Sequence, residues 1–467
     1  MASSDQRAAP APGLDAPFAL FSFLVALALI LHQLWWDGFD ARHGALMVAA
    51  GWTLLRPGSV PRFSLLMGVA VFTVAGDMPN VGDHILLVTV IGFFVLVQTA
   101  WMMIGSGGLP SGAELFERIA PMLRASAVVL YAAAALAKLN LDFFNPAVSC
   151  AREELSRIPL VDPGTIGAWS VEAAIVATIV TEIGLAVLLA VPRTRVVGLV
   201  VGGGFHIVLA LAGNVPFAAV MAALYVAFLP STAPATAQRT LRRWFGPVVE
   251  AVRPPTRPEG VAALAVMVVL WQLGGRLTDA APDLVEVLLE VIPRVVVIGL
   301  IGGTLILWIG SGGPLGSGRE HIVGSLRRLA PILALGLAVL VVNAASPYLG
   351  LKTQTSFNMF SNLRTEAGRW NHVLVPESVR IFGYQDQLVE VTSSNDPVLA
   401  RNAERGEQVA RLELERYLRR HPDAYATYID AEGRRRLMVA DGAGSPVRQV
   451  ADKVARFQPV PEEGSRC

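Results

Sequence analysis

Long apolar runs alternate with short polar connections over the first three quarters of this sequence. A run of about 20 apolar residues is long enough to cross a bilayer as a helix, and shorter runs would be tilted, re-entrant or interfacial. The pattern predicts an all-α polytopic membrane helix bundle of about 9–11 segments. We expect segments at 17–34, 44–55, 63–76, 84–104, 121–141, 168–191, 197–213, 215–230, 259–277, 290–309 and 328–346.

The pattern changes after residue 346, where short alternating stretches replace the apolar runs. Alternation of apolar and polar residues is typical of half-buried strands, and a period near 3.6 is typical of an amphipathic helix. We therefore expect a small α+β C-terminal domain. Its predicted strands lie near 371–375, 379–382, 386–392, 425–430 and 435–440, with a turn at Glu432-Gly433 and a single helix over 397–420.

These patterns divide the chain into three expected parts. Residues 1–16 are polar and rich in Pro and Ala, which indicates a disordered cytoplasmic tail without a cleaved signal peptide. Residues 17–346 form the transmembrane domain, and residues 347–467 form an extracytoplasmic cap.

The placement of arginine predicts the orientation in the plasma membrane. Neighbouring basic loops are each separated by two apolar segments, so all of them fall on one side, which the positive-inside rule makes cytoplasmic. The N-terminus is then cytoplasmic, and Lys138 lies at the outer end of its helix. The basic loops are 56–62, 118–124, 192–195, 239–257 and 319–328.

Composition narrows the function classes. The chain is 53% hydrophobic and 16% charged, with a formal net charge of +1, which argues against a nucleic-acid partner. The sequence has no metal-ligand spacing, no phosphate-binding loop and no nucleophile-elbow motif, so we expect no metal. Membrane lipids are therefore expected partners of this chain.

Lys138 is the first candidate for chemistry. Lysine occurs three times, at Lys138, Lys352 and Lys453, in a chain with 38 lysines and arginines in total. A desolvated lysine can become a neutral amine and act as a base, whereas arginine keeps its proton. Ionisable groups within membrane helices are functional candidates, but a lysine near a helix end can also extend to the interface. Both interpretations stay open.

Three further residues are candidates for the same site. His84 opens an outer-side segment directly after Asp83, His206 lies within segment 197–213, and Glu182 lies within segment 168–191. A buried polar group needs a partner, so His206 can equally form a structural hydrogen bond to a neighbouring helix. Consecutive helices are often neighbours, which makes a cluster of Lys138, Glu182 and His206 plausible.

Two sequence features allow more than one explanation. Cys150 and Cys467 both fall on the predicted outer side, where they fit either a disulfide or a free terminal thiol. Residues 309–313 resemble residues 104–108, and residues 328–331 resemble residues 118–121. Between the two parts of each copy lies a Ser-x-x-Glu capping box, Ser111 with Glu114 and Ser317 with Glu320. The echo fits a duplicated helix pair or a common way of entering the membrane.

Two motifs resemble a known family. Residues 131–140, followed by Asp142-Phe143, resemble the "YF-x-AG-x-x-KL-x-x-DW" segment of the HTTM (horizontally transferred transmembrane) family, which includes vitamin K-dependent gamma-carboxylase and bacterial relatives. Residues 357–361, Phe-Asn-Met-Phe-Ser, resemble its "SW-x-MF" motif. Glu182, the turn at 192–195 and Phe205-His206 are similar to later helices of the family.

The resemblance implies a carboxylase-like membrane protein that oxidises a quinol or lipophilic substrate at the outer face. The lysine that matches Lys138 is the base, and an outer-side histidine, matched here by His84, assists it. We expect His206 to help stabilise the anion and Glu182 to tune the cluster. The implied partner is a lipid or quinone-like small molecule, and the implied reactants are reduced vitamin K or menaquinol, oxygen and carbon dioxide.

This chain departs from the family pattern at two places. Phe143 stands where the family has Trp, and the tail is much shorter than the lumenal portion of the carboxylase, which argues against a protein substrate. The alternative is a non-catalytic membrane transporter or scaffold. Replacement of Lys138 by Arg separates the two, because only catalysis requires an amine that loses its proton.

Overall fold

The computed structural model describes residues 16–34, 40–159, 161–229, 291–310, 322–440, 452–461 and 467. Several predictions fall outside these residues. They are the N-terminal tail before residue 16, the basic loop at 239–257, the segment at 259–277 and the capping box of Ser317 with Glu320.

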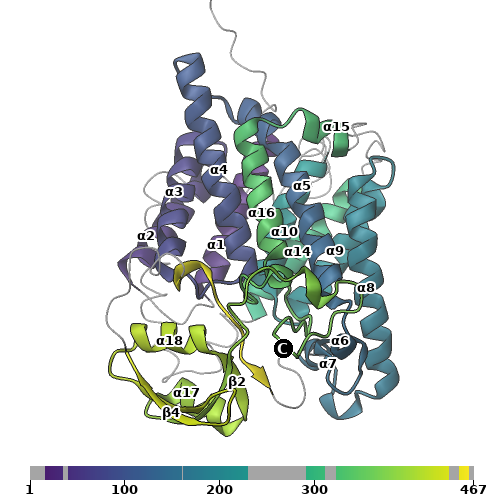
Figure 1. The fold of residues 1–467 in the computed structure, drawn as a ribbon. Coiled ribbons are helices and arrows are strands. Elements are labelled where there is room, and N and C mark those ends of the chain that lie inside the picture. The colour runs from purple at the N-terminus through teal and green to yellow at the C-terminus, as the bar shows by residue number, and fades with distance from the viewer. Residues whose placement is uncertain are drawn as a thin grey trace, which may run out of the picture. The chain divides into compact units, whose positions relative to one another are not determined.

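Six helices in the described ranges are long and apolar enough to cross a membrane. The chain is a multi-pass membrane protein, and every predicted segment that lies within the described residues overlaps a helix (Figure 1). The six long helices are α1 (Ala16–Leu34), α3 (Val60–Asp77), α4 (Asp83–Ser106), α5 (Gly112–Lys138), α8 (Ala168–Ala190) and α16 (Pro331–Leu349). The other helices of this part of the chain are α2 (Ala41–Leu55), α9 (Arg195–Leu211), α10 (Val215–Tyr225), η2 (Val226–Phe228), α14 (Ile292–Gly310) and α15 (Ile322–Arg327).

The helix α5 begins nine residues before the segment predicted at Pro121. Its start is the first predicted capping box, which the structure confirms. Ser111 Oγ accepts a hydrogen bond from the Glu114 backbone N–H (3.2 Å), and the Glu114 carboxylate accepts one from the Ser111 backbone N–H (2.8 Å). Pro121 lies inside the helix, because this cap starts the helix upstream of it.

The chain folds as two compact units. The first comprises Met1–Thr73, Val88–Ala127 and Val187–Leu337, and the second comprises Val74–Leu87, Val128–Ala186 and Ala338–Cys467. In the first unit, α10 packs against α1, α9 and α14. Buried Phe18 and Phe21 of α1 contact Phe63 of α3, with ring centroids 5.5 and 5.6 Å away.

The second unit contains a five-stranded antiparallel sheet in the order β4-β3-β1-β2-β5, of which Figure 1 labels β2 and β4. Residues of its helices and strands share one apolar core that includes Val391, Leu399, Leu414 and Tyr428. The strands are β1 (Leu388–Ser394), β2 (Glu407–Ala410), β3 (Tyr425–Ile429), β4 (Arg435–Val439) and β5 (Val460–Pro461). The short helices of this unit are α6 (Leu141–Phe144), α7 (Cys150–Ser156), η1 (Pro163–Thr165), η4 (Glu377–Val379), α17 (Pro397–Glu404) and α18 (Arg411–Arg420).

The predicted α+β character is confirmed, but three predicted elements are wrong. The strands predicted at 371–375 and 379–382 are absent, and only His372 forms an isolated bridge, with Asn140. The helix predicted over 397–420 is two helices separated by β2. Gly406 takes a left-handed φ of 61°, and Val409 then pairs with Val389 in the sheet. A long-range partner for residues 407–410 therefore overrides their helical periodicity.

Candidate functional site

The candidate site is built around the end of α5 in the second unit. The helix ends at Lys138, and Asn140 then caps the short helix α6, its side-chain oxygen accepting a hydrogen bond from the Phe143 backbone N–H (2.9 Å). Asparagine favours this capping position because its carbonyl satisfies a backbone donor that the helix leaves open. The local sequence thus turns the chain immediately after the lysine.

Lys138 and Glu182 form a buried ion pair between α5 and α8. Lys138 Nζ donates to Glu182 Oε1 at 3.1 Å, and the two residues are only 4% and 6% exposed. Lys138 Nζ also donates to the backbone carbonyl of Met359 (3.2 Å). Glu182 Oε2 is buried and has no hydrogen-bond partner among the described residues. One carboxylate oxygen is therefore available to accept a proton.

The two motifs that carry the family resemblance contact each other. Lys138 Nζ meets the Met359 carbonyl, and Asn140 Nδ2 donates to the Ser361 carbonyl at 2.5 Å, both pairs being 221 residues apart in the sequence. Because both separations are equal, residues 359–361 run parallel to residues 138–140. The end of α5 is therefore held by the segment after α16.

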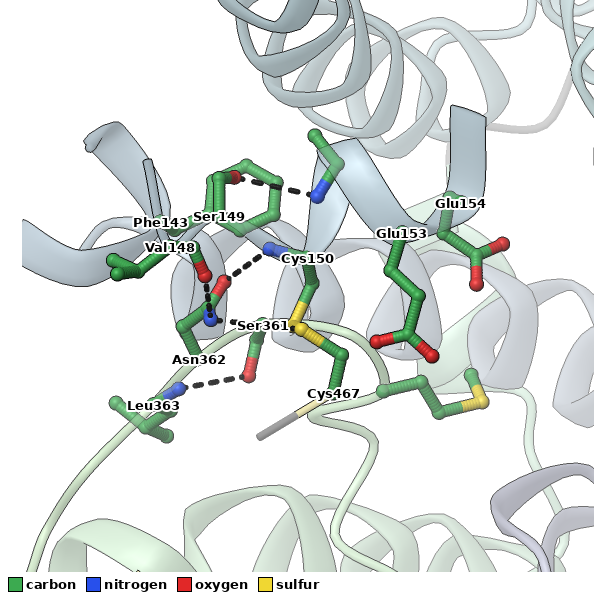
Figure 2. The surroundings of a disulfide bond; sticks show 12 residues. Phe143, Val148, Ser149, Cys150, Glu153, Glu154, Ser361, Asn362, Leu363 and Cys467 are labelled. Carbon is green, nitrogen blue, oxygen red and sulfur yellow. Dashed lines mark hydrogen bonds between the residues drawn. A yellow bond between two sulfur atoms is a disulfide. The ribbon is translucent and has the colours of Figure 1, made fainter. Parts of the chain in front are cut away.

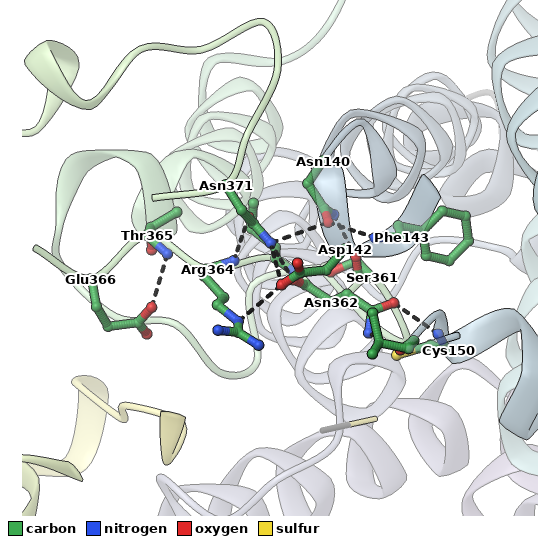
Figure 3. A network of polar contacts seen from close by, with 12 residues as sticks. Asn140, Asp142, Phe143, Cys150, Ser361, Asn362, Arg364, Thr365, Glu366 and Asn371 are labelled. Carbon is green, nitrogen blue, oxygen red and sulfur yellow. Dashed lines mark hydrogen bonds and ion pairs between the residues drawn. The ribbon is translucent and has the colours of Figure 1, made fainter. Parts of the chain in front are cut away.

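Polar contacts fix this segment further (Figure 3). Asn371 Nδ2 donates to Asn140 Oδ1 (3.2 Å), to Asp142 Oδ2 (3.0 Å) and to the Asn362 carbonyl (2.9 Å). Arg364 Nε lies 3.0 Å from Asp142 Oδ2. Networks of this kind hold a polar site in one geometry when its members are satisfied.

A disulfide joins Cys150 of α7 to Cys467, with 5.3 Å between their Cα atoms. Figure 2 shows Asn362 beside this bridge, where its side chain accepts a hydrogen bond from the Cys150 backbone N–H (2.8 Å) and donates one to the Val148 carbonyl (3.0 Å). Of the two possibilities left open by the sequence, the structure contains the disulfide. The bridge attaches residue 467 to the same region as the ion pair.

The segment that meets Lys138 has an unusual backbone. Thr355, Phe357, Phe360 and Asn362 all have φ between 49° and 60°, which is the left-handed region. This conformation costs free energy for bulky residues and persists only where surrounding contacts impose it. Such contacts are present, because the carboxylate of Asp83 accepts a hydrogen bond from the Phe357 backbone N–H (2.7 Å) and Thr355 Oγ1 donates to the Val81 carbonyl (3.0 Å).

Lys352 is a second buried lysine of the region, and we did not single it out from the sequence. It is 5% exposed, and its Nζ donates to the Thr355 carbonyl at 3.0 Å. Burial lowers the pKa of Lys352 to about 8, although the charge of Asp83 acts in the opposite direction. The rarity of lysine in this chain, which drew attention to Lys138, was the signal that could have found Lys352.

A cavity of about 280 Å³ lies against the strained segment. This volume is close to the lower limit of about 300 Å³ for small-molecule sites. Asp83, Met359, Phe360, Arg364 and Glu366 are among the lining residues, whereas Lys138 is not. Lys138 Nζ donates to the backbone carbonyl of Met359, which is itself a lining residue, so the amine is one residue away from the cavity.

Glu366 gives the cavity a carboxyl group with altered acidity. Its side chain is 3% exposed, and burial raises its pKa to about 7 against the opposing effects of nearby hydrogen bonds and arginines. The carboxyl group therefore changes protonation near neutral pH, and the cavity changes charge with it.

The two candidate histidines belong to different units. His84 is half-buried in the second unit, next to Asp83 at the start of α4. His206 is fully buried in the first unit, where its ring centroid lies 5.1 Å from that of Phe217 and 5.9 Å from that of Tyr225. The second unit thus brings Lys138 and Glu182 together, whereas the described ring contacts of His206 lie within the first.

His372 is a further residue that the sequence did not connect with the end of α5. Its Nδ1 accepts hydrogen bonds from the backbone N–H groups of Leu374 and Val375, so Nε2 carries the proton and donates to the Leu136 carbonyl at 2.9 Å. No group of three His, Cys, Asp or Glu side chains suited to a metal ion occurs in the described ranges.

Comparison with known proteins adds no match to this chain. No family model, curated protein or solved structure matches it.

Proposed function

We propose that this protein is a membrane enzyme in which Lys138 acts as a base on a lipophilic substrate, in the manner of the carboxylase that its motifs resemble. The contact between residues 138–140 and 359–361 is the observation that carries the proposal. Two motifs 221 residues apart, each singled out for its resemblance to the same family, meet at a buried lysine.

Glu182 supplies the proton acceptor that a lysine base needs. A proton moves from Lys138 Nζ to Glu182, which leaves a neutral amine and a protonated carboxyl group with no net change of charge. The 3.1 Å separation permits this transfer, and Oε2 of Glu182 offers a second position for the proton. The amine then takes a proton from a substrate hydroxyl, which leaves an ammonium group beside the substrate anion.

The substrate that fits this chemistry is a quinol. A reduced vitamin K or menaquinol, with oxygen and carbon dioxide, supplies the oxidation and carboxylation that the resemblance implies. Asp83 and Arg364 at the cavity wall would orient its hydroxyl groups, and Phe360 would contact its ring. The Met359 carbonyl would have to move from Lys138 for the amine to reach the substrate.

The ion pair also favours a second candidate, a non-catalytic transporter or scaffold. Lys138 has two hydrogen-bond acceptors, one from α8 and one from the segment after α16, so it joins three parts of the chain. In this role the lysine remains charged, and an arginine could replace it.

The test supplies a reduced naphthoquinone and oxygen to purified membranes and measures the epoxide by mass spectrometry. We expect epoxide from the unaltered protein, and none from Lys138→Ala, Lys138→Arg or Glu182→Leu. Lys453→Ala, which removes an exposed lysine of the same unit, is the matched control and should retain the activity. Size-exclusion chromatography establishes that each variant is folded. Folded protein that forms no epoxide, or Lys138→Arg with full activity, would overturn the catalytic proposal.

A further inference from the structure

A second cavity lies at the other end of α5, in the first unit. Its volume is about 630 Å³, and it is formed by the end of α4, the start of α5 and the turn before α16. These are ends of three helices that are long enough to span the membrane, which places the cavity at a membrane surface. It is independent of Lys138 and of the proposed reaction.

The cavity carries an excess of positive charge. Arg118, Arg327 and Arg328 line it, against a single lining carboxylate, Glu114, within the described ranges. Glu114 already accepts hydrogen bonds from the backbone N–H and the hydroxyl of Ser111 (2.8 and 2.9 Å). Three guanidinium groups against one carboxylate leave the described lining with a net positive charge, and phosphate is a ligand that guanidinium groups bind in a bidentate manner.

Both copies of the repeated sequence pattern contribute residues to the cavity lining. Residues 118–121 and 328–331 repeat the pattern Arg-x-Ala-Pro, and the cavity is lined by Arg118 from the first copy and by residues 328–331 from the second. On the glycine-rich side, a Cβ atom added at Gly105 or Gly108 would meet nothing within 4 Å. The cavity is thus open beside these two glycines.

Exposed apolar side chains lie at or next to the cavity in the sequence. Trp101 is 71% exposed and lines the cavity, while Ile104 and Leu109 are 81% and 52% exposed beside it. Tryptophan concentrates at the boundary between lipid headgroups and acyl chains. A soluble phosphate would gain nothing from these residues, whereas a lipid would contact them with its glycerol and acyl parts.

We propose that this cavity binds the phosphate-bearing headgroup of an anionic phospholipid. Arg118, Arg327 and Arg328 neutralise the headgroup, and Trp101 packs beside the glycerol region. Basic pockets between membrane helices bind anionic headgroups for the same electrostatic reason.

The test measures retention of phosphatidylglycerol relative to phosphatidylcholine by native mass spectrometry of the detergent-purified protein. Each arginine near the membrane surface contributes about a fivefold preference, so Arg118→Gln with Arg328→Gln should lower the preference about 25-fold. The exposed Arg327→Gln, which carries little risk to folding, should lower it about fivefold. Arg193→Gln, an exposed arginine of the same unit outside the cavity, should leave it unchanged.

Three results would overturn the proposal. The first is a preference for phosphatidylglycerol that is unchanged both in Arg327→Gln and in the double variant. The second is an equal loss of this preference in Arg193→Gln. The third is displacement of the lipid by millimolar inorganic phosphate. The last result would assign the cavity to a soluble phosphate compound instead.

Discussion

The two ends of α5 hold charge in different ways. At the Lys138 end, the charged groups are buried and their partners come from distant parts of the chain, as with Glu182. At the Gly112 end, Glu114 is exposed and its hydrogen bonds go to Ser111, three residues away. Buried charges depend strongly on their partners, whereas exposed charges are stabilised mainly by water. The same helix therefore has one end that is sensitive to substitution and one that is tolerant.

Breaking the buried pair should have the largest effect. Lys138→Met or Glu182→Leu alone should lower the free energy of unfolding by about 3–5 kcal/mol, because each leaves an unpaired buried charge. The double variant should be closer to the unaltered protein, since no buried charge remains. Unfolding of all three in detergent measures this coupling. Additive losses in the double variant would contradict the interpretation of the contact as an ion pair.

Removing the disulfide should have the next largest effect. Cys150→Ser or Cys467→Ser should each lower the free energy of unfolding by about 2–4 kcal/mol, because the bridge closes a large loop of the unfolded chain. The free energy of unfolding should fall equally in both variants. A reducing agent should lower it in the unaltered protein only. Unequal losses would indicate that one of the cysteines has another role.

Ionisation of the buried Glu366 should make the free energy of unfolding depend on pH. Its folded-state pKa of about 7 lies above its ordinary value, so stability from this group is present at low pH and is lost as the pH rises through 7. Glu366→Gln should therefore raise the free energy of unfolding at pH 8, by on the order of 3 kcal/mol, and should change it little at pH 4. Thermal unfolding at both pH values provides the measurement. A stabilisation that is equal at both would refute the buried ionised carboxylate.

The smallest effect should occur at the exposed end of α5. Ser111→Ala removes the hydroxyl of the capping box and should lower the free energy of unfolding by about 1 kcal/mol. Ser156→Ala, which removes a hydroxyl that donates within its own short helix, is a control for loss of a serine. A loss at Ser111 as large as that at Lys138 would remove the distinction between the two ends.

Several local features of the fold could be predicted from the sequence because they depend on nearby residues. The capping box at Ser111 requires only a Glu three residues later, and the turn at Gly433, which has a φ of 73°, requires a residue that tolerates this conformation. The strands predicted around 425–430 and 435–440 pair directly through this turn and are confirmed as β3 and β4. The prediction failed at β2, whose partners are not its neighbours in the sequence.

The sequence by itself determined that this is a multi-pass membrane protein, because the length and apolarity of a helix are properties of one continuous segment. It also identified Lys138 and Glu182 as polar groups in apolar surroundings. Only the tertiary structure decided that these two form a pair, that the Met359 carbonyl meets the same amine, and that Cys150 bonds to Cys467. Burial follows from the local pattern, but the partner of a buried polar group depends on which distant segment the fold brings within about 3 Å of it.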